Sequence, residues 1–244
     1  MRITTRTSSD GVTERHFTLG EVPGVLWTPD GAAGPRPLIV LGHGGGQHKQ
    51  APAMVGNARR FVTGAGFAAV ALDAPGHGDR PPTEEFTRLT TAHRARMQAG
   101  EDVTAGLVAL HDYVAGLAVP EWRAAVTAVQ ELDDVGPGPV GYWGMSMGCG
   151  LGIPFVAAEP RVRAAVLGLL GPLGQTEAAA RITVPVQFVL QWDDRLVPRE
   201  QGLALFDALG SAEKTLHANP GNHGEVPRFE SEAALRFFMR HFAA

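Results

Sequence analysis

The chain has 244 residues, of which 44% are hydrophobic and 19% are charged. A chain of this length and composition can bury one sizeable core, so we expect a single domain over residues 1–244. The formal net charge is −4, and the only lysines are Lys49 and Lys214. Because affinity for nucleic acids depends on clustered cations, this composition argues against a nucleic-acid-binding protein.

Membrane and secretory signals are missing from the sequence. No apolar run approaches the roughly 20 residues needed to span a bilayer, and residues 1–10 lack the apolar core of a signal peptide. The single cysteine, Cys149, excludes an internal disulfide and is typical of a reducing compartment. We therefore expect a cytoplasmic protein with no membrane contact. The oligomeric state, monomer or dimer, stays open.

Short apolar segments alternate with helical patterns along most of the chain. An antiparallel pair of strands is expected first, at 12–19 and 24–28. Further strands are expected at 37–41, 67–72, 139–143, 162–170, 185–190 and 214–217. Helices are expected at 51–64, 147–158, 199–209 and 230–242. This alternation predicts an α/β fold, a mostly parallel twisted sheet flanked by helices on both faces.

Residues from about 80 to 135 form the longest interval without a strand pattern, and we expect a helical excursion there. Apolar residues recur at three- and four-residue steps from Val103 to Leu117, which predicts one helix. A second helix is expected at about 121–132, because Pro120 is typical of a helix start. The polar piece at 81–98 is also expected to be helical.

The strongest local motif is Gly144-Met145-Ser146-Met147-Gly148, between an expected strand and an expected helix. A G-x-S-x-G sequence in this setting is a nucleophile elbow, in which a sharp turn exposes the serine hydroxyl. The amides of the new helix point at developing negative charge. Alone, the motif could be a chance match among 31 glycines. Its position directly after a short apolar strand favours Ser146 as a nucleophile.

Five segments together resemble the α/β-hydrolase superfamily. They are Gly42-His43-Gly44-Gly45, Asp73-Ala74-Pro75-Gly76-His77-Gly78-Asp79-Arg80, Gly144-Met145-Ser146-Met147-Gly148, Asp194-Arg195-Leu196-Val197-Pro198 and His223. Within the superfamily the chain is similar to the dienelactone-hydrolase-like branch of small bacterial serine esterases. The resemblance covers nearly all of the chain from Pro37 onward. It implies two-step acyl transfer to and from a small-molecule substrate without a cofactor.

The resemblance also implies the chain order nucleophile, acid, histidine. His223 is expected as the base, because it lies in a loop just past the last strand; His217, within that strand, is the alternative. Asp194 begins a D-x-x-V-P sequence and is expected as the acid that orients the base. Its neighbour Asp193 is the alternative.

The glycine-rich segment 42–46 follows the first buried strand, where the family supplies one amide of the oxyanion hole. Gly45 is the first choice for that amide and Gly44 the second, and Met147 supplies the other. A phosphate-binding turn is the alternative, but the segment lacks the Lys-Ser ending of a P-loop.

A metal site could be suspected from His43 and His77 with Asp73 and Asp79. No H-x-x-x-H or clustered-cysteine spacing accompanies them, so we expect no metal ligand. Cys149 lies beyond the elbow and is expected to be a buried structural thiol.

The leading hypothesis is a serine hydrolase that cleaves carboxylic esters of small or medium acyl groups through an acyl-enzyme on Ser146. The same triad serves thioesterases, lactonases, acyltransferases and perhydrolases, and these stay open. A non-catalytic binding module on the same scaffold is a further alternative. Dienelactone hydrolases proper use a cysteine nucleophile, where this chain has Ser146.

No large cap is expected after the strand that follows the elbow, because only Gly171–Arg181 separates Leu170 from the next strand. Any lid must then come from the region between Arg80 and Gln98. Phe86, Leu89 and Met97 are candidate pocket linings, with a plain surface helix as the alternative.

Overall fold

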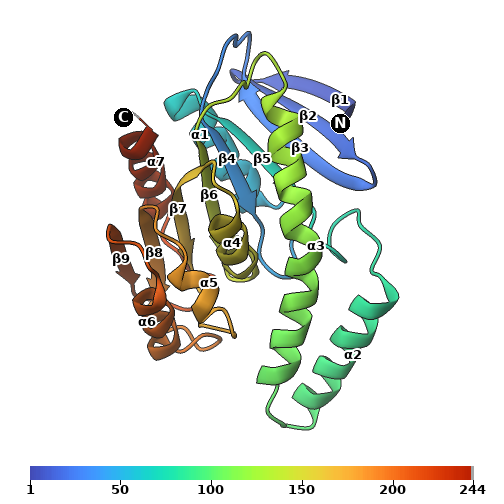
Figure 1. The fold of residues 1–244 in the computed structure, drawn as a ribbon, viewed down its shortest axis with the longest axis vertical. Coiled ribbons are helices and arrows are strands. Elements are labelled where there is room, and N and C mark those ends of the chain that lie inside the picture. The colour runs from blue at the N-terminus through green and yellow to red at the C-terminus, as the bar shows by residue number, and fades with distance from the viewer. Residues whose placement is uncertain (243–244) are drawn as a thin grey trace.

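The computed structural model describes residues 1–242 as a nine-stranded mixed sheet with seven helices (Figure 1). The strands are β1 (Arg2–Ser9), β2 (Val12–Leu19), β3 (Val22–Pro29), β4 (Leu38–Gly42), β5 (Ala68–Leu72), β6 (Val140–Met145), β7 (Val162–Gly168), β8 (Val186–Gln191) and β9 (Lys214–Asn219). The helices are α1 (Pro52–Ala65), α2 (Glu84–Gln98), α3 (Thr104–Gln130), α4 (Met147–Ala158), α5 (Thr176–Ala180), α6 (Arg199–Ala208) and α7 (Phe229–Phe242). The predicted domain runs to residue 244, and positions 243–244 lie outside the described residues.

The predicted α/β fold is confirmed. Strands follow the order β1-β2-β3-β5-β4-β6-β7-β8-β9, and pairing is parallel from β5 through β9. Helices α1 and α7 cover one face of the sheet, and α3, α4, α5 and α6 cover the other. In β4, Leu38 and Val40 pack on one face while Ile39 and Leu41 pack on the other. Both faces are therefore apolar, which explains the continuous apolar run in the sequence.

One strand was not predicted from the sequence. β1 pairs with β2 through the two-residue turn Asp10-Gly11, where both residues have a positive φ. Every residue of β1 is exposed, so the strand has no buried side to impose an apolar alternation. Its only sequence signal is the Asp-Gly pair, which is typical of tight hairpins.

The predicted break of the helical excursion at Pro120 is wrong, because α3 runs through it as one helix. A proline inside a helix removes one hydrogen bond and crowds the carbonyl four residues earlier, here that of Gly116. Buried side chains nevertheless continue across the proline at three- and four-residue steps: Val114, Ala118, Trp122, Val126 and Val129. The packing of these buried side chains outweighs the loss of one backbone hydrogen bond at Pro120.

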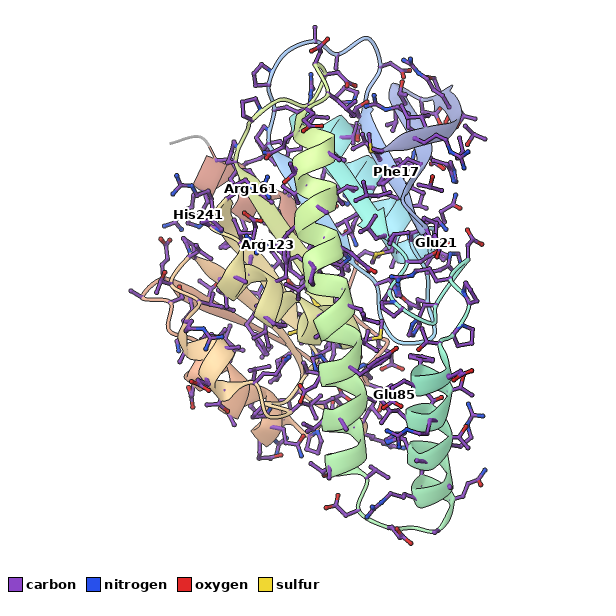
Figure 2. The ribbon with its side chains drawn as sticks, turned by 45° about the vertical axis from the view of Figure 1, so that its right-hand side comes forward. Phe17, Glu21, Glu85, Arg123, Arg161 and His241 are labelled. Carbon is purple, nitrogen blue, oxygen red and sulfur yellow. The ribbon has the colours of Figure 1, made fainter. Side chains whose placement is uncertain are left out.

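A buried carboxylate ties the second half of α3 to the end of α4. Glu159 accepts hydrogen bonds from Arg161 Nε at 2.8 Å and from Arg123 Nε at 3.4 Å. Burial would raise the pKa of Glu159, but the hydrogen bonds from Arg161 outweigh it and lower the pKa. Figure 2 shows Arg123 and Arg161 on the same side of the molecule.

Helix α2 lies beside the first half of α3, and the two extend past the sheet (Figure 1). The segment after β7 contains only the five-residue helix α5 before β8 begins. Among residues 1–242, no helix combines the length and hydrophobicity needed to cross a membrane.

Candidate active site

Ser146 lies at the sharp turn between β6 and α4, with φ of 56° and ψ of −123°. A non-glycine residue at positive φ is strained, as expected of a nucleophile elbow. A Cβ on Gly144 would collide with the backbone of Gly148, and one on Gly148 would collide with the backbone of Gly42. Glycine at these two positions therefore lets the strand and the helix meet at the serine.

The structure brings together the three residues predicted as a triad. His223 Nε2 lies 2.9 Å from Ser146 Oγ, and His223 Nδ1 lies 2.6 Å from Asp194 Oδ2. The other carboxylate oxygen of Asp194 accepts the amides of Leu196 at 2.8 Å and Val197 at 2.9 Å. With Nδ1–H donated to Asp194, the lone pair of Nε2 faces the serine hydroxyl, as a general base requires.

The alternative base, His217, and the alternative acid, Asp193, have other hydrogen-bond partners. His217, in β9, contacts Glu230 Oε2 through Nδ1 at 2.8 Å. Asp193 is exposed and accepts the amide of Gly221 at 3.1 Å. Among residues 1–242, neither side chain forms a hydrogen bond with Ser146 or His223.

The predicted oxyanion amides border the same cavity as Ser146, since Gly45 and Met147 both line it. The Gly44 amide donates to Gln47 Oε1 at 3.3 Å. The Gly45 amide has no hydrogen-bond partner among the described residues. The geometry therefore favours Gly45 over Gly44.

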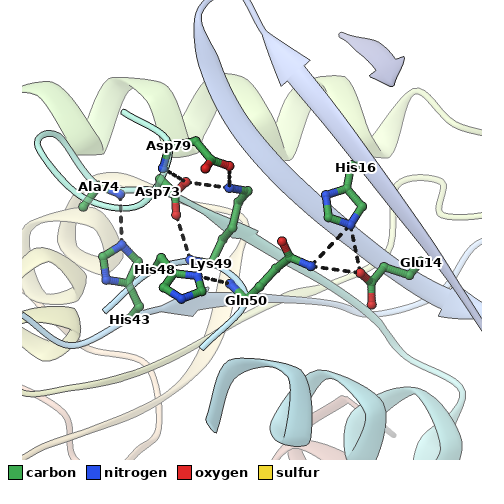
Figure 3. Close-up of polar contacts among 9 residues, drawn as sticks. All are labelled: Glu14, His16, His43, His48, Lys49, Gln50, Asp73, Ala74 and Asp79. Atoms are coloured by element: carbon green, nitrogen blue, oxygen red, sulfur yellow. Dashed lines mark hydrogen bonds and ion pairs between the residues drawn. The ribbon is translucent and has the colours of Figure 1, made fainter. Parts of the chain in front are cut away.

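His43 holds the glycine-rich loop. Its Nδ1 donates to the Gly44 carbonyl at 2.9 Å. Its Nε2 accepts a hydrogen bond from the Ala74 amide at 3.0 Å (Figure 3). The ring is only 1% exposed. Burial lowers the pKa of His43 to about 4, so the ring is neutral near pH 7. The sequence marked this histidine as part of the glycine-rich motif and as a residue from which a metal site could be suspected, and gave no sign of its contact with Ala74.

Lys49 forms ion pairs with Asp73 and Asp79, the two aspartates that could have suggested a metal site. Its Nζ donates to Asp73 Oδ2 at 2.6 Å and also to Asp79, and its amide donates to Asp73 Oδ1 at 2.8 Å (Figure 3). Burial opposes the charge on Lys49, but the hydrogen bonds that its ammonium donates to both carboxylates outweigh this effect and raise the pKa of Lys49. Within residues 1–242, no three His, Cys, Asp or Glu side chains gather as metal ligands would.

Cys149 is fully buried, and burial raises its pKa to about 12. The thiol is therefore protonated near neutral pH and unsuited to act as a nucleophile.

Two cavities meet at Ser146. The larger, about 400 Å³, lies against α2 and α3. The smaller, about 290 Å³, lies against α1 and the loop between β9 and α7. Phe86 lines the larger cavity, whereas Leu89 does not and Met97 is 58% exposed.

No protein-family model matches the chain. Among solved structures, the chain is similar to a cold-adapted esterase from an Arctic intertidal metagenomic library, in its PEG-bound complex. The identity is 35% and the TM-score 0.78, over 99% of this chain and 100% of that chain.

More distant structures share the fold. Acetyl xylan esterase from Paenibacillus sp. R4 has 15% identity and a TM-score of 0.69, over 98% of this chain and 87% of that one. Dienelactone hydrolase from Anabaena variabilis ATCC 29413 has 21% identity and a TM-score of 0.62, over 94% and 99%. The chain belongs to the α/β-hydrolase superfamily, in the same family as the esterase at 35% identity.

Proposed function

We propose that the chain hydrolyses carboxylic esters through an acyl-enzyme on Ser146. The observation that carries the proposal is the hydrogen-bonded series Ser146, His223 and Asp194, with contacts of 2.9 Å and 2.6 Å, at the junction of two cavities. The relative at 35% identity is an esterase, which supports ester cleavage as the reaction.

In the first half-reaction, Ser146 Oγ attacks the carbonyl carbon of the ester and passes its proton to His223 Nε2. Asp194 stabilises the imidazolium through Nδ1. The carbonyl oxygen becomes an oxyanion, which accepts the amides of Gly45 and Met147. The tetrahedral intermediate then collapses, the C–O bond to the alcohol breaks, and His223 returns its proton to the leaving oxygen.

In the second half-reaction, His223 takes a proton from water, and the resulting hydroxide attacks the acyl-enzyme. The same two amides hold the second oxyanion. Collapse releases the carboxylic acid, and the proton goes back to Ser146 Oγ. The reaction needs only side chains, amides and water, so we propose no cofactor.

Small or medium acyl groups are proposed as substrates, because a cavity of about 400 Å³ borders Ser146. Thioesters and lactones of the same acyl groups belong in the same assay, since they differ from esters only in the leaving group.

Hydrolysis of p-nitrophenyl esters from acetate to octanoate tests the proposal. Ser146→Ala is expected to lower kcat by at least about 10³-fold, and Ser9→Ala, on the exposed strand β1, serves as the matched control. A fluorophosphonate is expected to label wild type and Ser9→Ala but not Ser146→Ala. Wild-type protein that neither turns over any ester nor reacts with the fluorophosphonate would contradict the proposal.

A further inference from the structure

The two cavities at Ser146 border different parts of the proposed machinery. Gly45 and Met147, which carry the oxyanion amides, line the larger cavity, and His223 lines the smaller one. The proton that His223 takes from Ser146 has to reach the alcohol oxygen as the C–O bond breaks, so the alcohol lies on the side of His223. The acyl group stays bonded to Ser146 and extends into the larger cavity, past Gly45 and Met147.

The larger cavity borders two antiparallel helices, α2 and α3, which lie side by side (Figure 1). Directly before α2, Thr83 Oγ1 lies 2.6 Å from the hydroxyl oxygen of Tyr113 in α3. Further along α2, His93 passes Gly106, on which a Cβ would lie 3.8 Å from His93 Nδ1. Residues later in α2 therefore face residues nearer the start of α3.

The beginning of α2 adjoins the catalytic loops. The Phe86 ring packs edge-on against His77, with ring centroids 5.7 Å apart. The centroid of His77 lies 5.3 Å from that of His43, which holds the loop that carries the Gly45 amide. Because α2 and α3 are antiparallel, Val114 on α3 lies at the same end as Phe86. This end of the cavity is the catalytic end.

The cavity extends from the catalytic end along about two turns of each helix. Its lining runs from Phe86 to His93 on α2, and from Val114 through Leu110 to Leu107 on α3. A separation of seven residues corresponds to about 10 Å along a helix axis, at 1.5 Å per residue. An extended alkyl chain advances about 1.25 Å per carbon, so about eight carbons span this distance.

The walls suit an apolar chain. Among residues 1–242, no acidic side chain, lysine or arginine lines the larger cavity. The Thr90 hydroxyl donates to the Phe86 carbonyl at 2.8 Å, and His111 Nδ1 accepts from Gln175 Nε2 at 3.2 Å. These polar groups thus have partners within the chain. A charged group on the acyl chain would lose its water here without gaining an ion pair.

We infer that the larger cavity selects acyl chains by length, and that the substrates are esters of uncharged, apolar acyl chains of about eight carbons. Leu110 and Leu107 are the specificity-determining residues. Leu110 lies about 6 Å beyond Val114, at the level of about the fifth carbon from the catalytic end. Leu107 lies at the level of about the eighth. This inference rests on the proposed function and adds a substrate class to it.

The p-nitrophenyl esters from acetate to dodecanoate test the inference, because they share one leaving group and differ only in the acyl chain. In the wild type, kcat/KM is expected to rise several-fold for each added pair of carbons up to octanoate, and to rise no further beyond it.

Substitutions at two levels of α3 should stop the rise at two different lengths. Leu110→Phe is expected to lower the ratio of hexanoate to butyrate hydrolysis by about tenfold. Leu107→Trp is expected to lower the ratio of octanoate to hexanoate hydrolysis by about tenfold and to keep the ratio of hexanoate to butyrate. Ala109→Phe, on the exposed side of α3, is the matched control and should retain both ratios.

Two further comparisons test charge and orientation, with released acid titrated at constant pH. Methyl hexanoate and monomethyl adipate have acyl chains of equal carbon number, and only the adipate ends in a carboxylate. The wild type is expected to prefer the hexanoate by at least about tenfold in kcat/KM. In the series from ethyl to octyl acetate the variable chain is in the alcohol, so Leu107→Trp should not change the preference.

Fluorophosphonate labelling of Ser146 shows that each variant is folded. Leu107→Trp, at a half-buried position, keeps the test informative even if Leu110→Phe fails to fold.

Four results would overturn the inference. A wild-type optimum at acetate, or the same change of ratios in Ala109→Phe as in Leu107→Trp, would reject selection by length, with ester hydrolysis still standing. Preference for the adipate ester would reject the apolar chain. A changed preference among the alkyl acetates in Leu107→Trp would place the alcohol in the larger cavity. Absence of turnover for every ester, together with absence of fluorophosphonate labelling of Ser146, would remove the proposed function and this inference with it.

Discussion

His43 Nδ1 lies 2.9 Å from the carbonyl oxygen of Gly44, and this bond orients the next amide along the chain. The Gly44 carbonyl and the Gly45 N–H belong to one planar peptide and point in opposite directions. By holding the carbonyl, the buried imidazole turns the Gly45 N–H the other way. His43 is thus a positioning residue for the proposed oxyanion hole.

Replacing His43 by alanine should loosen this peptide. Loss of one oxyanion donor costs about 10²- to 10³-fold in kcat, and we expect His43→Ala to approach that loss with little change in KM. His43→Asn can still donate to the Gly44 carbonyl and should recover part of kcat. Steady-state kinetics of the three proteins on one p-nitrophenyl ester checks this. A rise in KM at unchanged kcat would show that His43 shapes the binding site instead.

The same histidine predicts how stability depends on pH. The pKa of His43 is lowered to about 4 in the folded chain, from 6.5 when exposed. Between these values the unfolded chain binds the additional proton, so the free energy of unfolding falls as the pH falls from about 6.5 toward 4. Between pH 7 and pH 5 the loss from this residue is about 2 kcal/mol.

Urea unfolding of wild type and His43→Gln at pH 7 and pH 5 measures the effect. His43→Gln should lose about 2 kcal/mol less than the wild type on acidification. His111, whose pKa is also lowered mainly by burial, contributes in the same direction in both proteins and cancels in the comparison. Equal losses in the two proteins would contradict the prediction.

The adjacent aspartates form a matched pair for testing the acid. Asp194→Asn should lower kcat by about 10⁴-fold, because an amide facing Nδ1 favours the wrong imidazole tautomer. Asp193→Asn, at an exposed carboxylate that bonds Gly221, should stay within about twofold of wild type. Measuring both on the same ester decides between them. Comparable losses at the two positions would contradict the assignment of Asp194.

Lys49 is expected to matter for stability. Lys49→Met leaves Asp73 charged and fully buried without its cation, which should lower the free energy of unfolding by about 3–5 kcal/mol. The chain's other lysine, Lys214, donates to three carbonyls at the end of α6 from a half-buried position. Lys214→Met should cost about 1 kcal/mol, and urea unfolding compares the two. A loss at Lys49 no larger than that at Lys214 would show that the buried pair contributes little.

Residues with a strong local constraint were predictable from the sequence. The run Leu38–Leu41 is apolar because both faces of β4 are buried. The glycines two residues before and after Ser146 are required by close contacts with the backbone of Gly148 and of Gly42. At β4 and at the turn around Ser146, the structure restricts which residue types can stand at consecutive positions, and this restriction is visible as a local pattern in the sequence. Ser146 and the parallel sheet could therefore be found without a structure.

Features that depend on distant contacts were not predictable. The exposed strand β1 needs only backbone pairing, and α3 continues past Pro120 because a buried stripe holds it to its neighbours. Asn57 and Arg228 come from α1 and from the loop before α7, and no local pattern indicates that they share a cavity. Such features depend on how distant elements pack.

The measurement that tests the central claim most directly is detection of the covalent intermediate. Wild-type protein mixed with p-nitrophenyl hexanoate is quenched in acid within one turnover, digested, and examined by peptide mass spectrometry. The proposed mechanism predicts a hexanoyl group on Ser146 and none in the Ser146→Ala protein. Ester turnover that persists in Ser146→Ala, with no acylated peptide in the wild type, would contradict it.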